Sequence, residues 1–149
     1  MRVAVASDHA GFPLKSMVIE TVRESGHEAI DLGANDSVQG DDYPDYAERI
    51  GKEINEGRAD RGILLCGSGV GVSIAANKIK GVYAAVCHDS YSAHQGVEHD
   101  AMNVLCLGTR IIGSELAKEL VRVFLNAQFS SEERHIRRVT KIRKIEKDN

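Results

Sequence analysis

The stretch Gly62-Ile63-Leu64-Leu65-Cys66-Gly67-Ser68-Gly69-Val70-Gly71 carries the clearest structural signal in the sequence. Arg61–Cys66 is a short apolar run typical of a buried strand, and glycines follow it at alternate positions 67, 69 and 71. A helical stretch then continues to about Lys78. A strand that passes through a glycine turn into a helix is typical of α/β proteins that bind an anion on backbone N–H groups.

Strand-like and helical stretches alternate on both sides of this segment. The expected strands are Arg2–Ser7, Glu28–Leu32, Arg61–Cys66, Val82–Cys87 and Asn103–Leu107. The expected helices are Phe12–Glu24, Asp45–Glu56, 70 to about 78, Asp89–Glu98, Ser114–Asn126 and Ser130–Lys147, the last capped by Ser130 or Ser131. Such alternation predicts one parallel sheet covered by helices on both faces. We therefore expect an α/β fold, a Rossmann-like three-layer sandwich formed by a single domain over residues 1–149.

The composition is that of an ordinary globular protein, with 42% hydrophobic and 28% charged residues. It excludes a disordered or collagen-like chain, and no apolar run approaches the ~20 residues that span a bilayer. The first apolar run reaches Asp8 too soon for a signal peptide, so we expect a cytoplasmic protein. Cys66, Cys87 and Cys106 form no CxxC pair, which favours a reducing compartment and argues against disulfides and zinc. No HExxH sequence or His/Cys cluster predicts a metal site.

Charge is distributed unevenly along the chain. The net charge is −3, but residues 130–149 hold seven Lys/Arg and four Asp/Glu, so this segment carries +3 and the rest −6. The protein as a whole therefore does not resemble a nucleic-acid binder. Arg134 and Arg138 share one helix face and fit a phosphate, with a solvated charged face as the alternative. The apolar residues here recur every three positions, so their stripe drifts around the helix and fits contact with a partner: Ile136, Val139, Ile142 and Ile145.

Reactive side chains follow four of the expected strands. Ligands of parallel sheets bind beyond the carboxyl ends of the strands, so these residues are the site candidates. They are Asp8 and His9, Cys66 to Gly71, His88 and Asp89, and Gly108 to Arg110. His99 and Asp100 close the helix before the last strand and can face the same edge. For His99 the alternative is a helix-terminal histidine that interacts with the helix dipole.

The glycine loop is best explained as an anion site. Its GxGxG spacing after the third strand differs from the dinucleotide fingerprint, which is GxGxxG after the first strand. No Gly-Lys-Ser/Thr follows, which excludes a Walker loop, and Val72 stands where a cysteine phosphatase needs arginine. The alternative is a tight turn with close packing.

Cys66 differs from the other cysteines because it stands at a strand end beside a helix N-terminus. That position lowers a thiol pKa from ~8.5 toward neutrality, so Cys66 is a candidate nucleophile or base. Ser68 places a hydroxyl in the same loop. The alternative is a small buried apolar residue, which is the role we assign to Cys87 and Cys106.

Several short sequence motifs occur in order along the chain. They are Asp8-His9-Ala10-Gly11-Phe12, Asp42-Tyr43-Pro44, the run from Gly62 to Gly71, Ser73 to Lys78, Asn103-Val104-Leu105 and Gly108-Thr109-Arg110. With them the chain resembles, over essentially its whole length, the type B ribose-5-phosphate isomerases, within the wider group that includes galactose 6-phosphate isomerases. The resemblance implies an aldose–ketose isomerase that interconverts ribose 5-phosphate and ribulose 5-phosphate through an enediolate. It implies no metal and no organic cofactor.

The resemblance also implies roles for individual residues. Cys66 would move the proton between C1 and C2, and His99 would open the furanose ring with Asp8 nearby. The oxyanion would lie on the backbone of the loop Gly67, Ser68, Gly69, Val70 and Gly71, with the Ser68 hydroxyl beside it. The phosphate would be bound by His9, Arg110, Arg134 and Arg138, and further substrate contacts would come from Tyr43 and Asp100. The site would lie at the interface of a homodimer or a dimer of dimers, reached by the C-terminal helix of the partner.

Two positions depart from the pattern of the family. Ser68 stands where threonine is frequent, and Asp100 where asparagine is common, so a carboxylate there would accept from a sugar hydroxyl but repel a phosphate. Two alternatives stay open. One is an isomerase of a six-carbon phosphosugar such as allose or galactose 6-phosphate. The other is a non-catalytic phosphosugar-binding protein, which would keep the glycine loop and the arginines but tolerate loss of Cys66.

Overall fold

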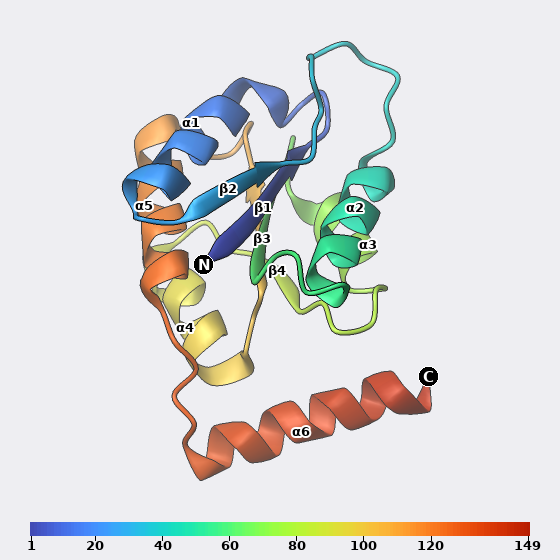
Figure 1. Cartoon of the computed structure of the whole chain (residues 1–149), viewed down its shortest axis with the longest axis vertical. Helices are drawn as coiled ribbons and strands as arrows, with labels where there is room; N and C mark the ends of the chain where they lie inside the picture. Colours follow the sequence, from blue (N-terminus) through green and yellow to red (C-terminus); the bar gives the residue numbers. More distant parts are fainter.

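A computed structural model describes all 149 residues and contains one five-stranded sheet (Figure 1). Its strands are β1 (Arg2–Ser7), β2 (Glu28–Asp31), β3 (Arg61–Cys66), β4 (Ala84–Val86) and β5 (Val104–Gly108). They are all parallel and lie in the order β2-β1-β3-β5-β4. The parallel α/β sheet predicted from the alternating pattern is therefore confirmed.

Helices cover both faces of the sheet. One face is covered by α1 (Phe12–Glu24), α4 (Ser90–Asp100) and α5 (Ser114–Asn126), and the other by α2 (Tyr43–Asn55) and α3 (Val70–Ala76). Alternate residues of each central strand enter the two cores, as Val3 and Val5 do on one face and Ala4 and Ala6 on the other. The central strands are thus apolar throughout because they are buried on both sides. None of the helices is both long and apolar enough to cross a membrane.

Several boundaries differ from those expected. β4 is three residues long rather than spanning Val82–Cys87, because the Tyr83 backbone N–H donates to the Asn103 side chain (2.8 Å) instead of to a neighbouring strand. Neither serine caps the last helix, so that prediction is wrong. Ser131 has a left-handed backbone (φ 58°), and the Ser130 hydroxyl instead contacts His135 Nδ1 at 2.6 Å, which leaves Glu132 at the N-cap.

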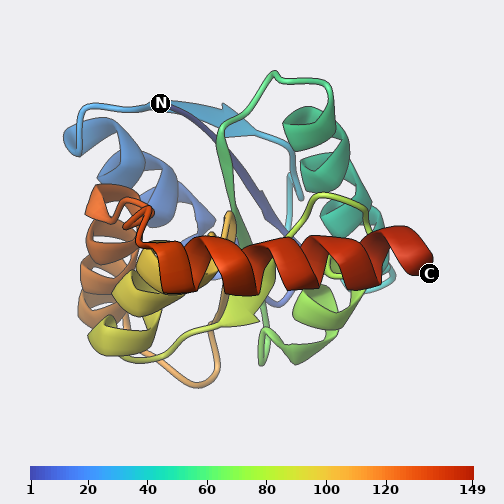
Figure 2. The same cartoon turned by 90° about the horizontal axis from the view of Figure 1, so that it is seen from below.

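The last helix, α6 (Glu133–Asp148), lies across the end of the sheet where the strands begin (Figures 1 and 2). Val139 is buried there, and near the other end of the helix Glu146 accepts a hydrogen bond from the Gly81 N–H at 2.7 Å. The remaining apolar side chains stay partly open, at 47% for Ile136, 40% for Ile142 and 64% for Ile145. The domain itself covers only part of the stripe that the sequence predicted.

Arg61 joins β3 to the end of α5. Its guanidinium donates to the carbonyls of Phe124, Leu125 and Ala127, the last at 2.7 Å, and lies 5.2 Å from the centre of the Phe124 ring. The last carbonyls of a helix lack partners within the helix, so a charged donor there satisfies groups that are otherwise left partly buried and unpaired. This contact fixes the segment that leads into α6.

We predict that Arg61→Met lowers the free energy of unfolding by roughly 2–3 kcal/mol, because methionine fills the space but donates no hydrogen bond. Urea denaturation of the two proteins measures the change. Arg2→Met is the matched control, since Arg2 is exposed and its side chain pairs only with Asp60 at 3.4 Å. Equal losses in the two variants would show that the bonds of Arg61 to α5 contribute nothing of their own.

Candidate active site

Three strand ends and the loops that follow them are tied together at the carboxyl edge of the sheet. The Asp8 N–H donates to the Leu65 carbonyl at 3.2 Å, which links β1 to β3. The Thr109 N–H donates to the Cys66 carbonyl at 2.9 Å, and the Arg110 N–H to the Gly67 carbonyl at 3.0 Å. These backbone bonds hold the loops in fixed positions, so the side chains at this edge meet in a defined arrangement.

Asp8 and Cys66 are in direct contact at this edge. The Cys66 thiol donates to Asp8 Oδ2 at 2.9 Å, while Asp8 Oδ1 accepts from the Gly11 N–H at the same distance. Asp8 is 4% exposed. Burial and the Asp8 carboxylate raise the pKa of the Cys66 thiol to about 11, although the N–H groups of Gly67 and Gly69 act in the opposite direction. The predicted lowering of this pKa is therefore wrong, because the sequence revealed neither the burial of the thiol nor the carboxylate beside it.

The glycine loop is both tightly packed and open to the edge of the sheet. Gly69 has φ 81°, a left-handed conformation that favours glycine, and a side chain at Gly71 would collide with the Tyr43 ring. Ser68 is exposed, and its hydroxyl accepts from the Val70 N–H at 3.3 Å. Close packing, the alternative considered from the sequence, accounts for part of this glycine pattern. It also brings the Tyr43 ring against the loop.

A cleft of about 400 Å³ opens at the same edge. His9 and Arg110 line it together, with Ser37 and Gln39 from the loop that follows β2. The Arg110 guanidinium also lies against Gly67, about 3.4 Å from where a side-chain carbon there would sit. The cleft thus combines an imidazole and a guanidinium next to the glycine loop, a combination suited to an anionic group.

Asp41, which the sequence did not single out, contacts His9 of the cleft. Its carboxylate lies 2.5 Å from His9 Nδ1 and accepts from the Tyr46 hydroxyl at 2.9 Å. The available signal was an acidic residue directly before Asp42-Tyr43-Pro44, in a loop expected to end near the site. His88 and Asp89, by contrast, have structural partners: His88 Nε2 accepts from the Gly108 N–H, and Asp89 accepts from the Ser92 N–H as the cap of α4.

His99 and Asp100 do not reach this edge, so in one chain they do not face the same edge as Cys66. α4 runs back from the carboxyl edge of the sheet, and its last residues therefore lie at the opposite end, beside α6. Arg134 and Arg138 lie there too, on the exposed side of α6. Of the residues predicted from the sequence, one chain thus unites Asp8, His9, Tyr43, Cys66, the glycine loop and Arg110, and places the other four elsewhere.

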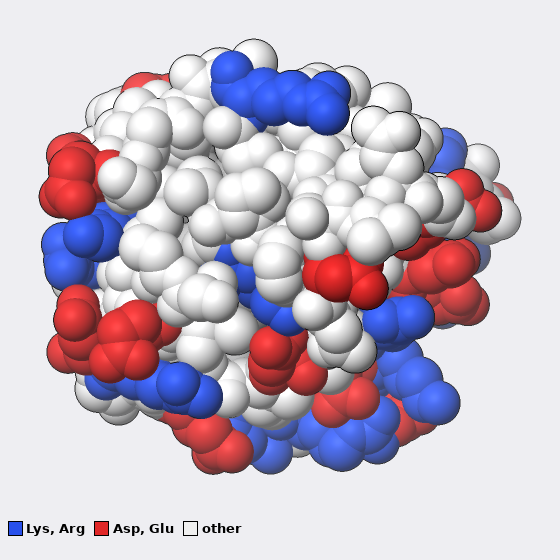
Figure 3. All heavy atoms as spheres, turned by 90° about the horizontal axis from the view of Figure 1, so that it is seen from above, with Lys and Arg blue, Asp and Glu red and all other residues white.

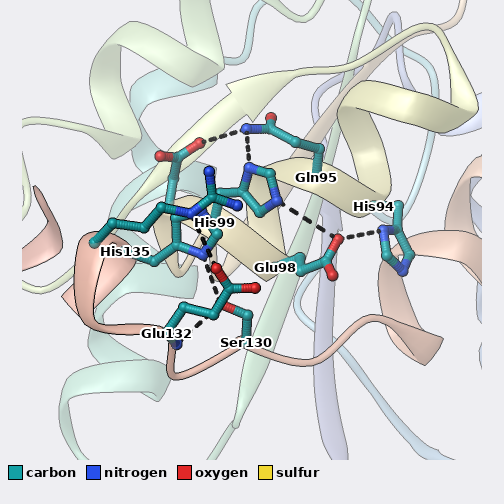
Figure 4. Close-up of polar contacts among 9 residues, drawn as sticks. His94, Gln95, Glu98, His99, Ser130, Glu132 and His135 are labelled. Atoms are coloured by element: carbon teal, nitrogen blue, oxygen red, sulfur yellow. Dashed lines mark hydrogen bonds and ion pairs between the residues drawn. The ribbon is translucent and has the colours of Figure 1, made fainter.

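The His99 ring is held by its neighbours (Figure 4). It stacks on the His135 ring with centroids 4.0 Å apart, and its Nδ1 lies 3.0 Å from the Gln95 amide. His135 is buried, and burial, helped by the His99 charge, lowers its pKa. His135 was not predicted as a site residue, although its position four residues before the apolar Val139 places it on the inner face of the helix.

The face that carries the cleft is largely uncharged (Figure 3). Seen from above, small groups of lysines and arginines are separated by acidic residues and by wide uncharged areas. No continuous basic surface covers the carboxyl edge of the sheet. The basic residues of α6 lie at the other end of the molecule.

Comparison with known proteins places the chain in a family. A sequence model of the Ribose/Galactose Isomerase family matches residues 3–142. Ribose-5-phosphate isomerase B of Escherichia coli is 44% identical over 145 residues, 97% of this chain and 96% of that protein. D-erythrulose-4-phosphate isomerase of Pectobacterium atrosepticum is 38% identical over 129 residues, 87% of this chain and 85% of that protein.

The fold also agrees closely with that of a solved relative. The solved structure of Clostridium thermocellum ribose-5-phosphate isomerase B superposes with a TM-score of 0.95 at 42% identity and covers 99% of both chains. The chain therefore belongs to the ribose/galactose isomerase family, on its type B ribose-5-phosphate isomerase branch, and is a sugar-phosphate isomerase.

Proposed function

We propose that this protein interconverts D-ribose 5-phosphate and D-ribulose 5-phosphate through an enediolate. The observation that carries the proposal is the Cys66 thiol, 2.9 Å from the Asp8 carboxylate and flanked by the N–H groups of the glycine loop. It provides a proton-transfer group with its own acceptor, next to donors for a developing oxyanion. The relatives that are named ribose-5-phosphate isomerase B favour the five-carbon substrate.

The chemistry assigns Cys66 as the base. As a thiolate, Cys66 removes the proton from C2 of the open-chain aldose, and the electron pair moves toward the C1 carbonyl oxygen to give the enediolate. Return of the proton at C1, with a proton shift between the two oxygens, yields the ketose. Asp8 accepts the thiol proton that must leave before Cys66 acts, and the N–H groups from Gly67 to Gly71 stabilise the negative oxygen. Ser68 adds a hydroxyl donor at the same loop.

The second half of the site comes from a partner subunit in this proposal. His99, Asp100, Arg134 and Arg138 lie at the end of the domain opposite Cys66, where they cannot reach a substrate bound by the same chain. In the proposed homodimer that end of one chain lies against the carboxyl edge of the other. Two-fold symmetry repeats this contact, so both sites are completed in the same way. The partner then adds cations to a face that has no continuous basic surface (Figure 3), and a dimer of dimers repeats the arrangement.

Within the shared site, the substrate is held at both ends. His9 and Arg110 bind the phosphate from one chain and Arg134 and Arg138 from the other, so that the remote phosphate fixes the reacting carbons. His99 transfers the proton that opens the furanose ring, while its stack on His135 keeps the imidazole in place. Tyr43, packed against Gly71, and Asp100 contact the sugar between these ends.

A four-carbon substrate is the second candidate, because a relative with 38% identity is a D-erythrulose-4-phosphate isomerase. The two candidates share the enediolate chemistry and differ in the length of chain between the phosphate cleft and Cys66. A coupled assay over four-, five- and six-carbon aldose phosphates separates them. The proposed function requires the highest kcat/KM on ribose 5-phosphate.

We predict that Cys66→Ala abolishes isomerisation, while binding of ribose 5-phosphate largely persists. Alanine removes the base but leaves the cleft and the glycine loop. Activity and solvent isotope exchange at C2 should disappear together, and calorimetry measures the binding that remains. Cys87→Ala is the control, since Cys87 is a buried thiol packed near Met102. A Cys66→Ala enzyme with most of its kcat would show that another group is the base.

We predict that His99→Asn slows the turnover of cyclic ribose 5-phosphate far more than that of an acyclic substrate. Ring opening needs an acid–base group, and an acyclic sugar bypasses that step. The ratio of the two kcat/KM values is the measurement, with His94→Asn as the control because His94 is exposed on the same helix and pairs with Glu98. Equal losses on both substrates would reject a ring-opening role for His99.

A further inference from the structure

Asp41 links the turn before α1, the first turns of α2 and its own loop through one carboxylate. Its Oδ2 accepts from the His9 backbone N–H at 3.0 Å and from the Tyr46 hydroxyl at 2.9 Å, while its Oδ1 lies 2.5 Å from His9 Nδ1. The side chains of Asp41 and His9 are only 22% and 24% exposed. The loop carboxylate therefore contacts both the backbone and the ring of a residue that lines the cleft.

The charge of this carboxylate fixes where the His9 ring carries its proton. Burial alone raises the pKa of Asp41, but the hydrogen bonds from His9 and Tyr46 outweigh it and lower the pKa below its usual value. Asp41 is thus ionised at neutral pH and only accepts hydrogen bonds, so Nδ1 of His9 must carry a hydrogen. In the neutral ring Nε2 is then a bare acceptor, and it becomes a donor only when the ring is the doubly protonated imidazolium.

A phosphate in the cleft requires the second of these states. Its oxygens accept hydrogen bonds, so Nε2 can contact them only as N–H, and an unbalanced Asp41 charge so close would repel the anion. The charged and titratable groups around His9 are Asp41 in its loop, Tyr46 on α2, Arg110 after β5 and Asp8, whose carboxylate is turned to Cys66 and Gly11.

From this geometry we propose that Asp41 is a positioning residue, which orients His9 and makes phosphate binding take up a proton at the imidazole. The inference rests on the proposed function only in placing the phosphate of the substrate at His9. It adds selectivity for the dianionic phosphate group of the sugar, because the Asp41 carboxylate contacts the His9 imidazolium and the imidazolium contacts the phosphate. A sugar without phosphate gains no such contact.

The test uses inorganic phosphate and no turnover. Calorimetric titration at about pH 8, which is above the ordinary pKa of histidine (~6.5) and at which inorganic phosphate is mostly the dianion, is repeated in buffers of different ionisation enthalpy. The wild-type protein should take up close to one proton for each phosphate bound. Asp41→Asn should bind inorganic phosphate roughly tenfold more weakly and lose most of the proton uptake, since a neutral partner favours the imidazolium less.

Asp36→Asn is the matched control. Asp36 lies in the same loop and accepts only from the Val38 N–H at 3.0 Å, so this change removes the same charge without touching His9. In steady-state kinetics Asp41→Asn should raise KM for ribose 5-phosphate with a much smaller change in kcat. Equal effects of the two substitutions on phosphate affinity and proton uptake would overturn the proposal.

A second measurement needs no variant. Nitrogen-15 NMR of the wild-type imidazoles should show His9 protonated at Nδ1 in the free protein and at both nitrogens with phosphate bound. A free ring protonated at Nε2 alone would also overturn the proposal. Its failure is distinct from that of the proposed function: an active ribose 5-phosphate isomerase without proton uptake contradicts only the role of Asp41, and proton uptake without isomerisation contradicts only the reaction.

Discussion

In a parallel α/β sheet every helix returns the chain from the carboxyl edge of the sheet to its amino edge, and this constraint governs the site. Residues that follow a strand, such as Asp8 and Cys66, gather at one edge, while residues that end a helix, such as His99, are placed at the other. α6 extends the second group along the amino edge with Arg134 and Arg138. One chain therefore holds the two groups of residues of the proposed phosphosugar site at opposite edges, and in this proposal a second chain unites them.

In the proposed site, each reactive side chain contacts a neighbour that affects its protonation or its orientation. Burial and the Asp8 carboxylate raise the pKa of the Cys66 thiol to about 11, so the thiol is protonated at neutral pH and must lose its proton before it can act as the proposed base. Asp41 contacts His9 in the cleft, and His135 stacks on His99 at the other end of the domain. In the proposed site, proton transfer and anion binding thus depend on pairs of residues rather than on single side chains.

The sequence predicted the sheet because its strands read as apolar runs between helices of clear periodicity, as in Arg61–Cys66 and Ser114–Asn126. It also predicted which side chains follow the strands, since the edge at which they meet depends only on strand direction. Strand direction alone does not place His99. Because α4 runs back from the carboxyl edge, a residue at its end lies at the amino edge, and the direction of the helix has to be considered to see this. The contacts of Asp41 and His135 were missed for another reason: Asp41 meets His9 across 32 residues of sequence, and spacing places His135 on the inner face of its helix without identifying His99 as its partner.

Subunit mixing tests most directly whether two chains form each site. Cys66→Ala and Arg138→Ala homodimers should both be impaired, the latter by roughly ten- to a hundredfold in kcat/KM through loss of a charge-assisted hydrogen bond. If the site is shared, a hybrid dimer combines the intact Cys66 of one chain with the intact Arg138 of the other. An equal mixture should then regain about a quarter of wild-type activity, because half the dimers are hybrids with one of two sites restored. Hybrids that demonstrably form but regain no activity would show that each chain completes its own site, and would contradict the account.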